Sequence, residues 1–258
     1  MYLRYVALGD SQTEGLNDGS DETGFRGWAD RLAEHVAALN PDLQYANLAI
    51  RGRRTHEVLS EQLPAAVAMR PDLATVVAGM NDLIRPSFSA ITVARDLEEM
   101  FAALRGVGAQ VATLTFPDLG KIAPVMTRIA ARVPELNELI AAAAARHGVV
   151  VLDGWTPAVT TDPRVWSPDR IHATPLGHGL IAAGMAYALG LPGSSSAWMD
   201  PLPPLPVRSR REIVAGEVAW AGKFLVPWLG RRVMRRSSGD GRVAKRSTLT
   251  PVVVRSAS

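Results

Sequence analysis

The hydrophobic residues of the chain alternate between short apolar runs and stretches in which apolar residues recur every three or four positions. Short apolar runs predict buried strands, and the longer spacing predicts amphipathic helices. The predicted strands are RYVAL at 4–8, LQYANLAI at 43–50, DLATVVA at 72–78, AQVATLT at 109–115 and VVVLD at 149–153. The predicted helices cover 25–39, 55–69, 91–104, 134–147 and 174–190. Strands that alternate with helices predict an α/β protein whose parallel sheet is covered on both faces.

The pattern changes after residue 192, and we therefore expect one α/β domain over residues 1–192. The proline-rich stretch PLPPLP falls within 193–212 and predicts a stiff, extended linker. Residues 213–236 combine an apolar stripe with basic and aromatic residues, which predicts an amphipathic basic helix. The polar, basic composition of 237–258 predicts a disordered tail.

The net charge of +3 conceals an asymmetry along the chain. Residues 1–192 carry 16 Lys/Arg and 21 Asp/Glu, whereas residues 193–258 carry 12 Lys/Arg and 4 Asp/Glu. The helix at 213–236 is therefore expected either to fold back onto the acidic domain or to lie on an anionic membrane surface. Nucleic acid is not an expected partner, because no recognisable reading motif accompanies the positive charge.

Several classes of site and location are excluded or disfavoured. The chain has no cysteine, so it has no disulfide, thiol nucleophile or zinc–cysteine site. We find no metal-ligand spacing, and Gly15 and Gly19 do not have the spacing of a phosphate or dinucleotide loop. We therefore expect no metal and no cofactor. We find no signal peptide and no apolar run near the roughly 20 residues of a membrane span, so we expect a cytoplasmic protein.

Polar clusters follow the predicted strands, at the edge of the sheet where α/β proteins bind ligands. Ser11 follows the first strand, Gly52 the second and Asn81 the third, and Asp169 and His172 come after the fifth. Each has a structural interpretation on its own, as a helix cap, turn former or loop residue. Their occurrence together along one sheet edge favours a common site.

Acyl transfer needs these residue types. A serine hydroxyl such as that of Ser11 becomes a nucleophile when a base such as His172 takes its proton, and Asp169 can orient the imidazole. The oxyanion of a tetrahedral intermediate needs hydrogen-bond donors, which the N–H groups of Ser11 and Gly52 and the side-chain amide of Asn81 can supply. The chain lacks the G-x-S-x-G motif of the common α/β-hydrolase fold.

The four clusters together resemble the conserved blocks of the GDSL family of esterases and lipases, also called SGNH hydrolases. The resemblance covers about residues 3–190. The matching blocks are GDS at 9–11, Gly52, GMND at 79–82 and DRIH at 169–172. The family usually has a hydrophobic residue where this chain has Gln12, and we expect that difference to affect only local packing.

The resemblance implies a three-layer α/β/α, flavodoxin-like sandwich with a five-stranded parallel sheet in the order 2-1-3-4-5. It also implies a catalytic triad of Ser11, His172 and Asp169, with an oxyanion hole formed by Ser11, Gly52 and Asn81. The family includes enzymes for acetylated sugars, lysophospholipids, thioesters and simple esters.

Two of the other residues near these blocks, Asp10 and Asp82, are expected to play supporting parts. Asp10 either supports the oxyanion loop or simply forms the turn, and Asp82 anchors the loop that carries the asparagine. Arg51 is expected to be a solvated loop residue, with attraction of an acidic substrate as the alternative.

The expected function is hydrolysis of carboxylic esters of short acyl or acetyl groups through an acyl-enzyme intermediate. One alternative is a non-catalytic binding module on the same scaffold, because a fold does not fix a function. The other is a membrane-associated lysophospholipase that uses the basic helix at 213–236.

Overall fold

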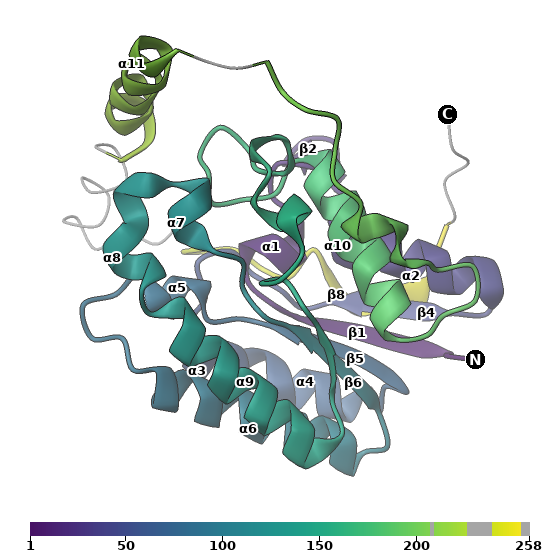
Figure 1. The fold of residues 1–258 in the computed structure, drawn as a ribbon. Helices are drawn as coiled ribbons and strands as arrows, with labels where there is room; N and C mark the ends of the chain where they lie inside the picture. The colour runs from purple at the N-terminus through teal and green to yellow at the C-terminus, as the bar shows by residue number, and fades with distance from the viewer. Residues whose placement is uncertain (207–208, 226–238, 254–258) are drawn as a thin grey trace.

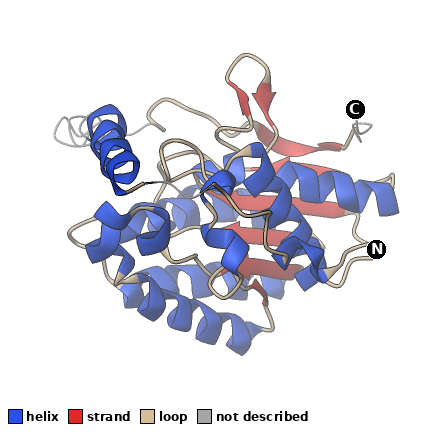
Figure 2. Cartoon of the chain, turned by 45° about the horizontal axis from the view of Figure 1, so that its top comes forward, coloured by secondary structure: helices blue, strands red, loops and turns tan. Residues whose placement is uncertain are grey.

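A six-stranded sheet forms the centre of the computed structural model, which describes residues 1–206, 209–225 and 239–253 (Figures 1 and 2). The strands lie in the order β7-β6-β5-β1-β4-β8. Their bounds are β1 Arg4–Gly9, β4 Gln44–Asn47, β5 Leu73–Val77, β6 Gln110–Leu114, β7 Val150–Leu152 and β8 Arg246–Pro251. β1, β4, β5, β6 and β7 are parallel, and their order across the sheet is the predicted 2-1-3-4-5 when they are numbered along the chain.

The sixth strand corrects two predictions. β8 pairs antiparallel with β4, with Tyr45 opposite Thr250, so the predicted five-stranded sheet is wrong by one strand. Residues 246–251 are consequently ordered, whereas the sequence predicts a disordered tail over 237–258. An antiparallel neighbour can satisfy the backbone groups of an exposed edge strand, which gives the segment a reason to order.

Charge pairing explains why this basic segment binds the acidic domain. The Lys245 ammonium donates to the Glu14 and Phe25 carbonyls at 2.6 and 3.1 Å and contacts an Asp30 carboxylate oxygen at 2.5 Å. Arg242 forms a two-pronged ion pair with Asp21. The basic segment after residue 192 therefore forms ion pairs with the acidic domain before it.

Helices cover both faces of the sheet, as the alternating pattern predicts (Figure 1). The two on one face are α2 Trp28–Leu39 and α10 Pro175–Ala188. Those on the other face are α3 Thr55–Glu57, α4 Leu63–Ala68, α6 Ala90–Gly106 and α9 Val133–His147. Successive residues of β1 supply both apolar cores: Val6 and Leu8 face one core, and Tyr5 faces the other.

The helix predicted over 55–69 is continuous but contains a π turn at Val58–Gln62 between α3 and α4. The turn presents the buried Gln62 to the end of β1. The Gln62 carboxamide accepts from the Gly9 N–H and donates to the Gly9 carbonyl, both at 2.9 Å. The π turn therefore fixes the backbone two residues before Ser11.

Short elements connect this framework. The short helices and strands are α1 Ser11–Glu14, β2 Gly19–Ser20, β3 Gly24–Phe25, α5 Met80–Leu83, α7 Leu119–Ile122 and α8 Thr127–Ala130. Single 3-10 turns lie at Pro124–Met126, Ala158–Thr161, Pro163–Val165 and Ser196–Met199.

The predicted basic helix begins earlier than its sequence pattern suggests. α11 covers Arg210–Trp220 and continues as a π turn over Ala221–Leu225, so the first part of the predicted 213–236 helix is helical. The remainder of that prediction lies outside the described residues. Within the described ranges, every helix is too short or too polar to span a lipid bilayer.

Candidate active site

The turn from β1 into α1 places Ser11 at the carboxyl edge of the sheet. Gly9 has a φ of 155°, and a β-carbon there would lie 2.4 Å from the Val77 carbonyl oxygen, so this turn requires glycine. Asp10 caps α1 by accepting a hydrogen bond from the Gln12 N–H. The sequence GDSQ therefore presents the serine on a tight turn between strand and helix.

Ser11, His172 and Asp169 form a continuous hydrogen-bonded chain. The Ser11 Oγ lies 2.9 Å from His172 Nε2, and His172 Nδ1 lies 2.8 Å from Asp169 Oδ2. Burial raises the pKa of Asp169, but hydrogen bonds and the charge of His172 outweigh burial and lower the pKa to about 2. The carboxylate is consequently charged at neutral pH, as is needed to hold Nδ1–H and leave Nε2 facing the hydroxyl.

The loop that carries Asp169 and His172 is secured from α11. Arg170 adopts a left-handed φ of 59° and directs its guanidinium to Glu217, with contacts of 2.7 and 2.8 Å. The same guanidinium lies 4.8 Å from the centre of the Trp220 ring. The helix that the sequence leaves free either to fold back or to bind a membrane therefore contacts the domain beside the candidate base.

Two of the three donors expected for the oxyanion hole are backbone N–H groups. Among the described residues, neither the Ser11 N–H nor the Gly52 N–H has a hydrogen-bond acceptor. Gly52 lies in the left-handed region at a φ of 80°. The third expected donor is engaged, because Asn81 Nδ2 donates to Asp10 Oδ2 and to the Arg53 carbonyl, each at 3.0 Å.

Two acidic side chains, the buried Asp10 and the partly buried Asp82, connect these loops. Asp10 accepts from Asn81 as well as from Gln12, and burial raises the pKa of Asp10 to about 7. Asp82 accepts from the N–H and the hydroxyl of Thr55 at 3.0 and 3.3 Å, and burial raises its pKa too. Both acids therefore bind the asparagine block to its neighbours, Asp10 to the serine turn and Asp82 to the segment after the second strand.

Arg51 differs from its predicted role as a solvated loop residue. Its side chain is buried and pairs with Glu14, and its N–H donates to the same carboxylate at 2.7 Å. A hydrogen-bonded, buried ion pair at this point holds the loop that leads into Gly52. The prediction is wrong because the sequence does not show that Glu14, one turn after Ser11, faces this arginine.

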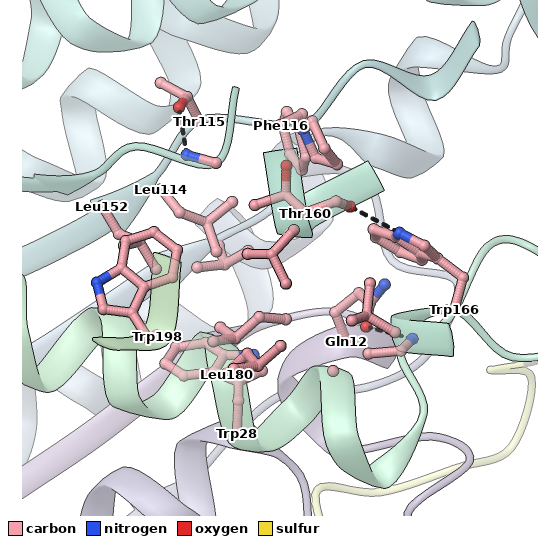
Figure 3. Close-up of a pocket in the computed structure, with 18 of the residues that line it drawn as sticks. Gln12, Trp28, Leu114, Thr115, Phe116, Leu152, Thr160, Trp166, Leu180 and Trp198 are labelled. Atoms are coloured by element: carbon pink, nitrogen blue, oxygen red, sulfur yellow. Dashed lines mark hydrogen bonds between the residues drawn. The ribbon is translucent and has the colours of Figure 1, made fainter. Parts of the chain in front are cut away.

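An apolar cavity of about 80 Å³ lies beside the site (Figure 3). Three of its lining residues are Gln12, Met80 and Ala173, the chain neighbours of Ser11, Asn81 and His172. Most of the remaining wall is hydrophobic and includes Trp28, Leu114, Leu152, Leu180, Ile181 and Trp198. The sequence does not reveal this cavity, because its walls come from segments far apart along the chain.

The expectation that Gln12 affects only local packing is also wrong. Its Nε2 donates to the Ile171 carbonyl at 2.8 Å, and its Oε1 accepts from the Ala173 N–H at 3.3 Å. These contacts reach both sides of His172 and go beyond local packing. The available signal was a polar residue at a position where the resembled family has an apolar one.

A model of the GDSL-like lipase/acylhydrolase family matches residues 7–180. The chain belongs to this family. The GDSL assignment places the chain among the carboxylic ester hydrolases. No curated protein sequence matches the chain. Within the described residues, no group of three or more His, Asp or Glu side chains is arranged to hold a metal ion.

Solved structures of an alpha/beta hydrolase, a lipase/acylhydrolase and an acetylxylan esterase have a similar fold. An alpha/beta hydrolase enzyme from the metagenome of Lake Arreo, Spain, is 22% identical with a TM-score of 0.62, covering 73% of this chain and 95% of that one. The lipase/acylhydrolase from Enterococcus faecalis is 23% identical with a TM-score of 0.60, covering 72% and 95%. An acetylxylan esterase from Geobacillus stearothermophilus is 16% identical with a TM-score of 0.61, covering 75% and 97%.

Proposed function

We propose that this GDSL-type protein hydrolyses carboxylic esters of short acyl groups through an acyl-enzyme on Ser11. The observation that carries the proposal is the position of the His172 ring, which contacts the serine hydroxyl through Nε2 and the Asp169 carboxylate through Nδ1. A serine that only begins a helix does not require an imidazole on its hydroxyl with a carboxylate on the far side of that imidazole. This pair supplies the base that makes a serine nucleophilic.

The first half-reaction transfers the acyl group to the protein. His172 Nε2 takes the hydroxyl proton as Ser11 Oγ bonds to the ester carbonyl carbon, and the carbonyl oxygen becomes an oxyanion. The Ser11 and Gly52 N–H groups stabilise that charge. Asn81 adds a third donor when its Nδ2–H turns from the Arg53 carbonyl to the oxyanion. The intermediate then collapses, and His172 returns the proton to the departing alcohol.

The second half-reaction releases the acid. His172 takes a proton from water while the water oxygen attacks the acyl carbon, and collapse of this second intermediate breaks the bond to Ser11 Oγ. The serine recovers its proton from His172. Asp169 stays ionised throughout, because its lowered pKa favours the carboxylate beside the imidazolium that forms twice in each cycle.

The cavity favours acyl groups of two to four carbons. The cavity is small, about 80 Å³, and the bulky side chains of Trp28 and Trp198 in its wall favour a short acyl chain over a long one. Its apolar walls suit an uncharged acyl chain and not a charged one. We therefore infer acetyl to butyryl esters as substrates.

A fluorophosphonate probe tests the nucleophile. The wild-type chain should be labelled, and Ser11→Ala should not be. Ser60→Ala is the control, because it removes an exposed serine hydroxyl from the π turn between α3 and α4, and it should be labelled like wild type. Hydrolysis of p-nitrophenyl esters from acetate to octanoate should decline beyond butyrate. Equal labelling of Ser11→Ala, or a wild type as inactive as His172→Ala, would favour the non-catalytic binding module.

The membrane-associated lysophospholipase has one supporting observation, the apolar surface of α11. Val214 is 62% exposed and Val218 is 69% exposed, four residues apart on that helix. If α11 docks on anionic lipid, the chain should float with anionic liposomes, and Val214→Asp with Val218→Asp should abolish flotation. These substitutions are preferable to truncation before α11, because truncation would also remove β8 from the sheet.

A further inference from the structure

The side chain of Gln12 contacts the backbone on both sides of His172. Gln12 is the second residue of α1, directly after Ser11. Its carboxamide donates to the Ile171 carbonyl and accepts from the Ala173 N–H, at 2.8 and 3.3 Å. One carboxamide thus satisfies an acceptor and a donor two residues apart, in the way that a neighbouring strand would.

The N–H and the carbonyl of His172 itself form hydrogen bonds with other residues. The His172 N–H donates to Asp169 Oδ1 at 3.0 Å, and the His172 carbonyl accepts from the Ser167 N–H at 2.8 Å. All four backbone groups from the Ile171 carbonyl to the Ala173 N–H therefore have partners. Gln12 provides two of the four, and it is the only one of these anchors that adjoins the nucleophile in the chain.

We propose that Gln12 is a positioning residue that sets the distance between Ser11 Oγ and His172 Nε2. This inference deepens the proposed function and rests on it. One helical turn carries both the nucleophile and the anchor of the base, so the two groups are connected through a few bonds instead of across the whole domain. Because a displacement of about 1 Å can cost about a hundredfold in rate, such an anchor has a catalytic consequence.

The residue's chemistry makes this role particular to this chain. An apolar side chain at position 12, as in the family pattern the sequence resembles, can form neither of the two hydrogen bonds. It would leave the Ile171 carbonyl and the Ala173 N–H without these partners, and an unpaired polar group away from water is unfavourable. A glutamine therefore adds a constraint on the histidine that the apolar residue does not supply.

Gln12 also lines the cavity, so a role in acyl selection must be distinguished from a role in positioning. If Gln12 acts through the cavity wall, its replacement should change the ratio of butyrate to acetate hydrolysis. If it acts through His172, its replacement should slow both esters by the same factor, because proton transfer is common to them.

Gln12→Met, which keeps the length of the side chain and removes both hydrogen bonds, provides the test. We expect kcat to fall about tenfold to a hundredfold on p-nitrophenyl acetate and butyrate alike, with KM nearly unchanged. The downfield NMR resonance of the proton between His172 and Asp169 should broaden in the variant. Gln110→Met is the matched control, since Gln110 lies at the start of β6, at the amino edge of the sheet, and should change neither readout.

Each outcome decides the inference. Wild-type kcat in Gln12→Met would overturn it, and so would a loss confined to butyrate. If the methionine variant unfolds, Gln12→Glu replaces it, because glutamate keeps the size and polarity of the side chain but cannot donate to the Ile171 carbonyl when it is ionised. Wild-type kcat in Gln12→Glu at neutral pH would overturn the inference. If the wild type hydrolyses neither ester, the proposed function fails. The positioning role is tested independently by NMR, because an unchanged resonance of the His172–Asp169 proton in Gln12→Met would overturn it.

Discussion

The buried ring of His178 on α10 gives a prediction about stability at low pH. Its Nδ1 accepts from the Trp28 N–H at 3.2 Å, and its Nε2 donates to the Leu16 carbonyl at 2.9 Å. This arrangement requires the neutral ring, because a proton on Nδ1 would face the Trp28 N–H. The ring is also fully buried, and burial lowers the pKa of His178 to about 4 from its ordinary 6.5.

The lowered pKa makes the folded state bind fewer protons than the unfolded chain between about pH 4 and 6.5. The stability due to neutral His178 is therefore fully present above about pH 6.5 and is lost as the pH falls towards 4. At about 1.4 kcal/mol per pKa unit, the complete loss is about 3 kcal/mol, of which about 2 kcal/mol has gone by pH 5. This is a large share of the stability of an ordinary domain.

The assay is urea unfolding followed by tryptophan fluorescence, with wild type and His178→Gln compared at about pH 7.5 and about pH 5. Glutamine offers one acceptor and one donor and does not titrate. We expect wild type to lose about 2 kcal/mol relative to this variant over that interval. The raised pKa of Asp10, which favours the folded state as the pH falls towards about 4, is present in both proteins and cancels in the difference.

His56→Gln is the control, because His56 is exposed, and it should follow wild type at both pH values. A difference between wild type and His178→Gln that stays constant from about pH 7.5 to about pH 5 would refute the reasoning. It would mean that the unfolded and folded states bind the same number of protons at His178.

Three further predictions concern the triad, the cavity and the C-terminal strand. Asp169→Asn should lower kcat about 10⁴-fold without unfolding the chain, because the imidazole loses its carboxylate, and p-nitrophenyl acetate hydrolysis within tenfold of wild type would contradict this role. Val159→Phe narrows the apolar cavity, so butyrate hydrolysis should fall relative to acetate hydrolysis; an unchanged ratio would place the acyl chain elsewhere. Lys245→Met should reduce the free energy of unfolding by about 2 kcal/mol, since Asp30 loses its cation, and a change under about 0.5 kcal/mol in urea titrations would show that this contact does not secure β8.

Local patterns in the sequence predict most of the framework. Apolar runs identify β1, β4, β5, β6 and β7 within a few residues of their observed bounds. Periodicity is visible in a single sequence because it depends only on which side chains of one element face the core. The exception is β8, where polar and basic residues suggest disorder and the stabilising partners lie more than 200 positions earlier.

For the site too, the sequence predicts which residue types are present but not how they are placed relative to one another. The blocks around Ser11, Gly52, Asn81 and His172 identify groups with the right chemistry, and their places after strands indicate a common edge. The sequence does not indicate that Asn81 is already hydrogen-bonded to the Arg53 carbonyl. That contact depends on how two separate loops meet.

By itself, the sequence determined the parallel α/β architecture and the family, and it predicted a set of residues whose chemistry suits acyl transfer. Only the tertiary structure decided that Ser11 and His172, 161 positions apart, lie in hydrogen-bond contact, that Gln12 brackets the histidine, and that a cavity lies beside them. The reason is physical: periodicity and turn chemistry act between near neighbours in the chain, whereas a distance between remote side chains depends on the packing of every element between them.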